Sequence, residues 1–235
     1  MGGRGGYSYS TYKAWKEMKT EVWSLAPWEY KTLKQFAEGL EQKDAEYRKQ
    51  DQYDNIVDWT GTTNYVQTIR HAQSGKDTGT AIYDKQEALR RANLIEDAIE
   101  QVSKEDQIVF KNGKAVRHYE GELYRGLKIP QETWDKTIKV GNEIGMEGLS
   151  SWSKSEFTAI SFAENGHLSF MGKKTVFRVM NGSGMDVDDV SVYGGAGGER
   201  EVIISSKARF QILSIDEPYM GTEDDIRTVY LRQIN

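Results

Sequence analysis

The segment YGGAGGEREVII, residues 193 to 204, places two carboxylates one residue apart, where a glycine-rich loop leads into an apolar run. If that run is a strand, Glu199 and Glu201 share a face, about 6 to 7 Å apart, because alternate side chains of a strand point the same way. Paired carboxylates suit reactions at the anomeric carbon of a sugar. One stabilises an oxocarbenium-like transition state, and the other orients or deprotonates the nucleophile. Two solvated acids at a strand end show the same pattern.

Two upstream segments carry further polar groups. GELYRGL, residues 121 to 127, places Arg125 on an expected strand, followed by Gly126. Arginine binds phosphate through two hydrogen bonds, and glycine lets a ligand approach the backbone closely. GLSSWSKSEFTAISFA, residues 148 to 163, places Ser151 and Ser153 before an expected short helix. Alone, the first segment is more commonly a surface arginine before a turn. The second is commonly a set of serines that cap a helix.

The composition excludes several kinds of chemistry. The chain of 235 residues has a net charge of −5 and no cysteine, so disulfides, thiolate-bound zinc and cysteine nucleophiles are absent. His71, His118 and His167 show no metal-ligand spacing, and we expect no metal. The acidic balance argues mildly against nucleic acid as a partner. No segment approaches the ~20 apolar residues of a membrane span. The N-terminus lacks the apolar region of a secretory signal. We expect a soluble, monomeric protein.

The first half of the chain has helical patterning. Apolar residues recur at three- and four-residue steps from residue 11 to about 50, with a break expected at Pro27. A separate helix is expected through DNIVDWT, residues 54 to 60, ending at Gly61. Two more follow: TNYVQTIRHAQ, capped near Thr63 or Asn64, and DKQEALRRANLIEDAIEQV. SGKDTGT between them is expected to be a loop, and residues 1 to 10 to be disordered.

The pattern changes near residue 107. Strand-forming residues flank Asn112-Gly113, a hairpin-turn signal, and strands are expected within TVFRVM, EVIISS, ARFQILSI and RTVYLRQI. EFTAISFAENG predicts a short helix that ends at Gly166. The fold class is therefore α+β. We divide the chain into an N-terminal helical extension, 1–50, and a domain, 51–235, which is helical over 51–105 and β-rich over 106–235.

The order of the motifs is more specific than any one of them. Ser151 lies 26 residues after Arg125, and Glu201 lies 50 residues after Ser151. This order resembles the arginine–serine–glutamate signature of the mono-ADP-ribosyltransferases, in particular those of bacterial toxins and bacteriophages. Three further segments resemble the family's helical, strand and turn segments: IVDWTGTTNYVQTIRHA, TVFRVMNGSGMDVDDVS and EREVIISSKARFQILSI. The resemblance covers roughly residues 50 to 235. It implies a helical lobe followed by a mixed β-sheet sandwich core.

The resemblance also implies roles for single residues. Arg125 is expected to bind the phosphates of NAD+, and Gly126 to contact the nicotinamide carboxamide through its backbone. Ser151 is expected to support the catalytic glutamate and, with Ser153, to line the NAD+ site. Glu201 is the expected catalytic glutamate, which hydrogen-bonds the nicotinamide ribose and stabilises the cation.

Other implied roles concern the acceptor and the nicotinamide. Glu199, the first glutamate of Glu-x-Glu, goes with transfer to arginine in this family. Tyr193, Gly194 and Gly195 belong to the expected target-recognition loop. Phe162 is placed to stack on nicotinamide, although a core phenylalanine explains it equally well. Trp152 departs from the family's usual threonine, which leaves the role of that side chain open.

The implied activity is transfer of ADP-ribose from NAD+, the cosubstrate, to arginine side chains of target proteins. NAD+ carries a good leaving group, so the reaction needs positioning and charge stabilisation and no metal. The alternatives are an NAD glycohydrolase, transfer to nucleic acid, and a catalytically silent interaction module. We expect the protein in the cytoplasm of a bacterial host cell, made there or delivered by a phage particle or a secretion machine.

Overall fold

The computed structural model describes residues 27–75, 82–165, 172–195, 198–216 and 225–234. The chain divides into two compact units, residues 1–48 and 49–235. The second unit holds every candidate site residue. Four predictions fall wholly or partly outside the described residues: the disorder of residues 1–10, the helix before Pro27, the loop at SGKDTGT, and the helix end at Gly166. Within the described ranges, no helix is both long and apolar enough to cross a membrane.

Helix α2 (Pro27–Gly61) begins at a proline and ends at a glycine, as the sequence indicates for these two residues. The separate helix predicted at 54–60 is wrong, because those residues form the last turns of α2. The physical reason is that neither proline nor glycine interrupts the chain between Gly39 and Gly61. Helical hydrogen bonding therefore continues without a break.

The next two helices were predicted at nearly these positions. Helix α3 (Thr63–Ser74) follows Thr62, whose side chain makes no capping bond, so the cap predicted at Thr63 or Asn64 is wrong. Helix α4 (Lys85–Glu105) is capped by Asp84, whose carboxylate accepts a bond from the backbone N–H of Glu87. Helix α4 buries the apolar stripe that the sequence shows.

The rest of the second unit is a mixed sheet with two short helices. Its strands are β1 (Gln107–Val109), β2 (Ala115–Ile129), β3 (Glu143–Gly145), β4 (Ser150–Ser153), β5 (Lys173–Asp186), β6 (Glu201–Ile204), β7 (Arg209–Asp216) and β8 (Arg227–Gln233), and its helices are α5 (Gln131–Thr137) and α6 (Glu156–Asn165). The strand order is β1-β2-β4-β6-β5-β8-β7-β3, and β2 also pairs with β5. Among the described strand pairs, β5–β8 is parallel and the others are antiparallel. This confirms the α+β prediction. The predicted hairpin turn lies between β1 and β2, with Gly113 at φ 81°.

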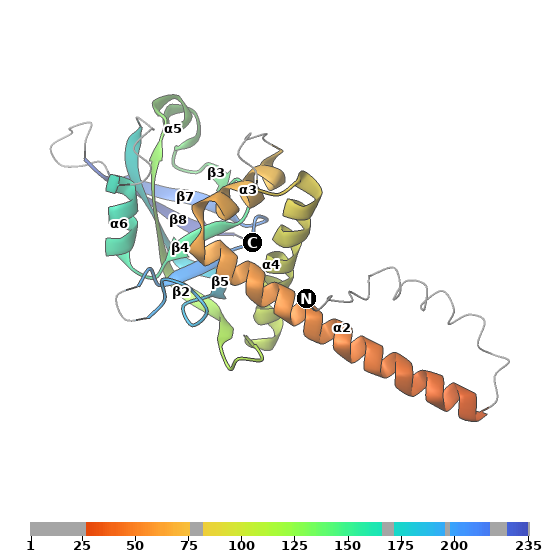
Figure 1. Ribbon diagram of the computed structural model, residues 1–235. Helices are drawn as coiled ribbons and strands as arrows, with labels where there is room; N and C mark the ends of the chain where they lie inside the picture. Colours follow the sequence, from red (N-terminus) through yellow and green to blue (C-terminus); the bar gives the residue numbers. More distant parts are fainter. Residues whose placement is uncertain (1–26, 76–81, 166–171, 196–197, 217–224, 235) are drawn as a thin grey trace. The chain divides into compact units, whose positions relative to one another are not determined.

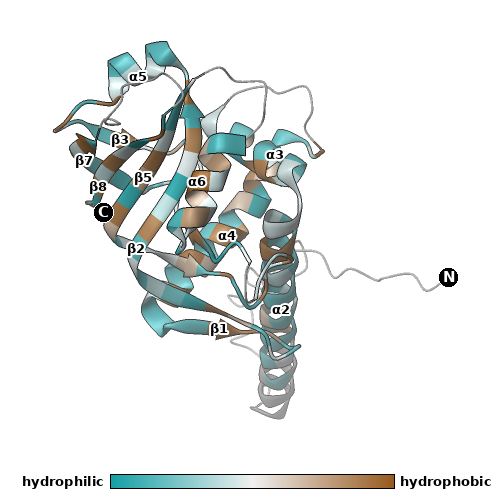
Figure 2. Ribbon diagram, turned by 90° about the vertical axis from the view of Figure 1, so that its left-hand side faces the viewer, coloured by the Kyte–Doolittle hydropathy of each residue, from teal (hydrophilic) through white to brown (hydrophobic). Residues whose placement is uncertain are grey.

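The long strands β2 and β5 position most of the site. They pair along most of their length, while β4 and β6 pair with each other and connect to β2 and β5 respectively. In Figure 1, α3 and α4 lie to the right of these strands and α6 to the left. One hydrophobic core joins the end of α2, α3 and α4 to the strands. A second lies among α5, β2 and β4 to β8. Figure 2 shows the hydrophobic residues of β5, α4 and α6 as brown bands.

Gly126 permits the close packing of α6 on β2. A Cβ atom at this position would lie 1.7 Å from the carbonyl oxygen of Ala159, in the backbone of α6. We expect Gly126→Ala to displace α6 and to destabilise the fold by about 3 kcal/mol, measured by urea denaturation. Gly39→Ala is the control, because a Cβ there meets nothing within 4 Å. Equal stability of the Gly126→Ala variant and the wild type would contradict this packing.

Candidate active site

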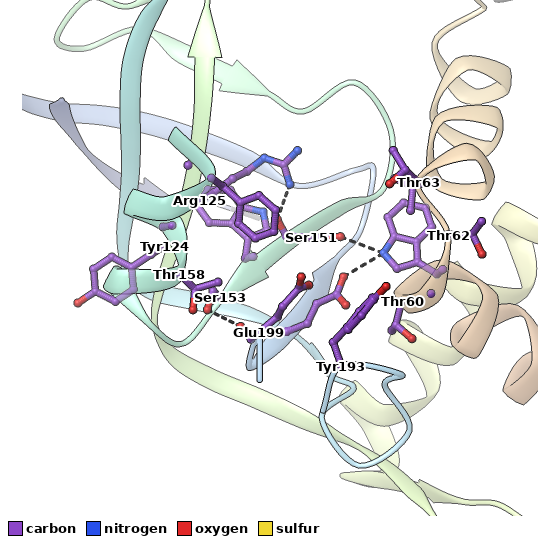
Figure 3. Close-up of a pocket in the computed structure, with 18 of the residues that line it drawn as sticks. Thr60, Thr62, Thr63, Tyr124, Arg125, Ser151, Ser153, Thr158, Tyr193 and Glu199 are labelled. Atoms are coloured by element: carbon purple, nitrogen blue, oxygen red, sulfur yellow. Dashed lines mark hydrogen bonds between the residues drawn. The ribbon is translucent and has the colours of Figure 1, made fainter. Parts of the chain in front are cut away.

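One cavity of about 280 Å³ brings together eight of the predicted site residues. They are Arg125, Gly126, Ser151, Ser153, Phe162, Tyr193, Glu199 and Glu201. The walls come from the end of α2, from α3, β2, β4 and α6, and from the segment that leads into β6. Figure 3 shows Tyr193 beside Thr60 on one side of this cavity, and Tyr124 and Thr158 on the other. The volume is close to the ~300 Å³ lower bound for small-molecule sites.

Gly194 and Gly195 do not line this cavity. They lie in a neighbouring hollow with three aspartates and Arg200. Their backbone geometry explains why glycine occupies both positions. A Cβ at Gly194 would lie 1.9 Å from the carbonyl oxygen of Asp188, and Gly195 has a φ of 99°. Their part in target recognition stays a prediction.

The two glutamates reach the cavity by a different route from the predicted one. Strand β6 starts at Glu201, and Arg200 before it has a left-handed φ of 51°. Strand alternation therefore does not place Glu199, and that explanation was wrong. Two bonds hold the turn: Ser153 Oγ donates to the Glu199 carbonyl at 2.6 Å, and the Lys154 N–H donates to the Arg200 carbonyl at 3.0 Å. Strained backbone of this kind is found preferentially at functional sites.

The Glu201 carboxyl is buried and held by two polar side chains. Glu201 as a whole is 6% exposed. The indole N–H of Trp59 donates to Glu201 Oε1 at 3.2 Å and to Ser151 Oγ at 3.0 Å (Figure 3). Burial raises the pKa of Glu201 to about 7, and the charge of Glu199 acts in the same direction. Hydrogen bonds from Ser151 and Trp59 and the charge of Arg125 oppose that rise. The carboxyl therefore titrates near neutral pH.

This raised pKa predicts a pH-dependent gain in stability for Glu201→Gln. The folded pKa of about 7 exceeds the ordinary 4.5, so the protonated form stabilises the fold below pH 4.5. That contribution is lost as the pH rises through 7. At pH 8, the free energy of unfolding of Glu201→Gln should therefore be higher than that of the wild type by on the order of 1–3 kcal/mol. Urea denaturation at pH 5 and pH 8 checks this. A difference of the same size at both pH values would contradict the raised pKa.

Two guanidinium groups line the same cavity. Arg125 donates from Nη1 to the Ser151 carbonyl, and its buried Nε has no partner among the described residues. Burial and the charge of Arg70 lower the pKa of Arg125 to about 9, which leaves it charged at neutral pH. Arg70, from α3, donates from Nε to the Glu147 carbonyl at 3.3 Å, and burial lowers its pKa too. Two arginines in one cavity suit a ligand with adjacent phosphates.

The remaining predicted residues divide between the cavity and the core. Phe162 and Tyr193 are 45% and 54% exposed at the cavity, so Phe162 is not a core residue. The Trp152 ring packs 5.2 Å from the Phe210 ring, and its indole N–H donates to Ser150 Oγ at 2.9 Å. Trp152 also lines the cavity, so the departure from the usual threonine lies where β4 separates the cavity from the core.

Sequence reasoning missed several residues that line the cavity. Trp59 and Arg70 are the main ones, and Thr62, Thr63 and Thr158 line it as well. Trp59 and Arg70 both lie in the segment IVDWTGTTNYVQTIRHA, which resembles a helical segment of the family, but no site role was predicted for either of them. Neither of the two described histidines, His71 and His118, lines the cavity, and His118 pairs with Ser183 Oγ. His167 lies outside the described residues. In the described ranges, no three histidine, aspartate or glutamate side chains gather as metal ligands.

Comparison with known proteins shows which solved structures share this fold. No protein-family model matches this sequence, and no curated protein does. Several solved structures match in shape. Vis toxin, an ADP-ribosyltransferase from Vibrio splendidus, is 18% identical with a TM-score of 0.57, over 90% of this chain and 87% of that chain. Another Vis structure, in complex with agmatine, is 19% identical with a TM-score of 0.57, over 79% and 74% of the two chains.

Two Pseudomonas proteins are similar as well. The ADP-ribosyltransferase HopU1 of Pseudomonas syringae pv. Tomato DC3000 is 15% identical with a TM-score of 0.52, over 78% of this chain and 76% of that chain. Exoenzyme S of Pseudomonas aeruginosa, described in complex with human 14-3-3 protein beta and bound to carba-NAD, is 16% identical with a TM-score of 0.50, over 78% and 73%. The chain therefore has the ADP-ribosyltransferase fold, which confirms the fold implied by the ordered motifs.

Proposed function

We propose that the protein transfers ADP-ribose from NAD+ to arginine side chains of target proteins and releases nicotinamide. The buried Glu201 carboxyl carries this proposal, because Trp59 and Ser151 hold it in one cavity with Arg125 and Glu199. The shared fold supports it, as does the carba-NAD bound to exoenzyme S.

The cavity supplies groups for the pyrophosphate, the nicotinamide and the nicotinamide ribose of NAD+. Arg125 and Arg70 would bind the pyrophosphate, since charged guanidiniums pair with phosphate oxygens. Gly126 lines the cavity on β2, where its backbone would meet the carboxamide, and the exposed ring of Phe162 would cover the nicotinamide. The ionised Glu201 would accept a hydrogen bond from a ribose hydroxyl.

The reaction then needs one bond to break and one to form. The bond between ribose C1′ and the nicotinamide nitrogen breaks, and its electron pair neutralises the pyridinium. The positive charge left on the ribose would be stabilised by the Glu201 carboxylate, which is itself buried. A guanidinium nitrogen of the acceptor attacks C1′ and loses its proton.

Glu199 would select arginine as the acceptor. A guanidinium has a pKa above ~12 and needs a carboxylate to orient it and to accept its proton. Glu199 lines the cavity, and burial raises the pKa of its carboxyl, which makes it a better base. The agmatine bound to Vis, which carries a guanidinium group, is consistent with this role. Tyr193 stands at the same rim and would contact the target protein.

We infer that the acceptor is a protein and not nucleic acid, because a chain with a net charge of −5 is poorly suited to bind a polyanion. We infer a toxin or effector role that is exercised by a monomer in the cytoplasm of a bacterial host cell. The description of Vis as a toxin supports this part of the proposal.

Calorimetry with NAD+ and an assay of nicotinamide release test the proposal together. We expect NAD+ to bind and nicotinamide to appear, faster when agmatine is added. Release at the same rate with and without acceptor, and with free ADP-ribose as the sole product, would favour an NAD glycohydrolase. Label in added RNA or DNA would favour a nucleic-acid acceptor. No binding of NAD+ would favour a silent interaction module.

A further inference from the structure

We propose that Trp59 is a positioning residue for Glu201, and that its indole N–H keeps the carboxyl oriented and ionised during turnover. The proposal rests on the function proposed above, because it assigns Glu201 the role of stabilising the cation.

The geometry around the indole is specific. Trp59 lies in the last turn of α2 and is 2% exposed. Its N–H is shared between Ser151 Oγ, 3.0 Å away, and Glu201 Oε1, 3.2 Å away. An indole has one N–H and no acceptor, so it can direct one carboxyl oxygen without competing for the substrate's hydroxyl. A carboxylate has about four lone-pair sites, so Glu201 can also accept a hydrogen bond from the ribose.

Packing explains the ring of Trp59 but not the polar contact. The ring belongs to the core that joins the end of α2 to α3, α4 and the strands. A phenylalanine would fill much of that space without a polar group. A buried N–H costs free energy unless it finds a partner, so placing one at this position requires the acceptors that Glu201 and Ser151 provide.

The groups that face Glu201 come from every wall of the cavity. Glu199 approaches from the preceding turn, Arg125 from β2 and Ser151 from β4, and Arg70 lines the cavity from α3. The hydrogen bond from Trp59 lowers the pKa of Glu201, against burial and the charge of Glu199. Removal of the N–H should therefore raise this pKa further and leave less of the carboxylate at pH 7.

The same helix end also contacts the loop that carries Tyr193. The Thr60 hydroxyl, next to Trp59, accepts a bond from the backbone N–H of Val192 at 3.1 Å. The last turn of α2 thus touches both the carboxyl that acts on the ribose and the loop that leads to the acceptor side of the cavity.

The experiment compares Trp59→Phe with Trp152→Phe in the full chain. Trp152 is a matched control for the loss of an indole N–H, because it is equally buried and also lines the cavity, but its N–H bonds Ser150 Oγ and not Glu201. For Trp59→Phe we expect kcat for nicotinamide release at pH 7 to fall about tenfold, with little change in KM for NAD+. We also expect the acid limb of the pH–rate profile to move up by about one pH unit, so that the loss shrinks near pH 9. Trp152→Phe should leave the acid limb in place.

A second variant and a second readout cover the other outcomes. If Trp59→Phe does not fold, 3-benzothienylalanine at position 59 keeps the ring shape and removes the N–H. The pKa of Glu201, measured by NMR of carbon-13-labelled glutamate carboxyls and assigned with Glu201→Gln, does not depend on activity. If the wild type releases no nicotinamide, the proposed function fails, while a raised Glu201 pKa still supports the positioning contact. An unchanged pKa, or an equal shift in Trp152→Phe, would overturn the proposal for Trp59.

Discussion

Glu201→Gln is expected to lower the rate of nicotinamide release by about 10³-fold, near the upper end for the loss of one preorganised electrostatic group. Glutamine has nearly the same shape and can still accept the N–H of Trp59, but it carries no negative charge. The charge that develops on the ribose would then lack its partner in a buried site, where electrostatic interactions are strong. Single-turnover measurement of nicotinamide release at pH 8 checks this, because Glu201 is largely ionised there.

Binding should respond much less than turnover, because the charge of Glu201 is needed mainly in the transition state. Calorimetry should therefore show that Glu201→Gln still binds NAD+, within a few-fold of the wild type. Glu96→Gln is the matched control: Glu96 is a glutamate held by Ser205 and Ser206, and it does not line the cavity. A rate within tenfold of the wild type for Glu201→Gln, or an equal loss in Glu96→Gln, would refute the assigned role.

Glu199→Gln is expected to separate two products that the wild type forms from the same NAD+. Transfer to agmatine should fall by about 10²-fold or more, the usual contribution of a general base. Hydrolysis to free ADP-ribose should stay within about threefold of the wild type, because water does not need to lose a proton before it attacks so electrophilic a centre. The two carboxylates face the same cavity, but only Glu201 is held by Trp59 and Ser151. Chromatography of both products from one reaction measures the ratio.

The control for this variant is Glu120→Gln, which removes a carboxylate from an exposed side chain on β2 away from the cavity. It should leave both products unchanged. If Glu199→Gln lost hydrolysis and transfer to the same degree, the separate roles of the two glutamates would be wrong. Glu199 would then support the binding of NAD+ or the shape of the turn at Arg200.

Much of this site was readable in the sequence because its motifs are local. Glycine before a strand, arginine on a strand and serines before a helix each leave a short pattern. The resemblance of their order to the family signature implied one shared site. The structure places Arg125, Ser151, Glu199 and Glu201 around one cavity. The fold was predictable for the same reason, since the periodicity of α4 and of the later strands follows from side chains a few residues apart.

What the sequence did not show depends on contacts between distant segments. Trp59 reaches Glu201 across 142 positions, and no local pattern at DNIVDWT signals a polar partner there. Arg70 looks like any arginine on an amphipathic helix until α3 is placed against the cavity. The left-handed φ of Arg200 was also hidden, because it is imposed by the bonds from Ser153 and Lys154 to the neighbouring carbonyls.

The most direct test of the central claim is to incubate the purified chain with agmatine and NAD+ labelled in its ADP-ribose portion, and to identify the labelled product by mass spectrometry. We expect ADP-ribosyl-agmatine, with an equal amount of nicotinamide released in the transfer. We also expect Glu201→Gln to form almost none of this product. No labelled agmatine, or the same yield from Glu201→Gln as from the wild type, would contradict the proposal that this cavity transfers ADP-ribose to arginine.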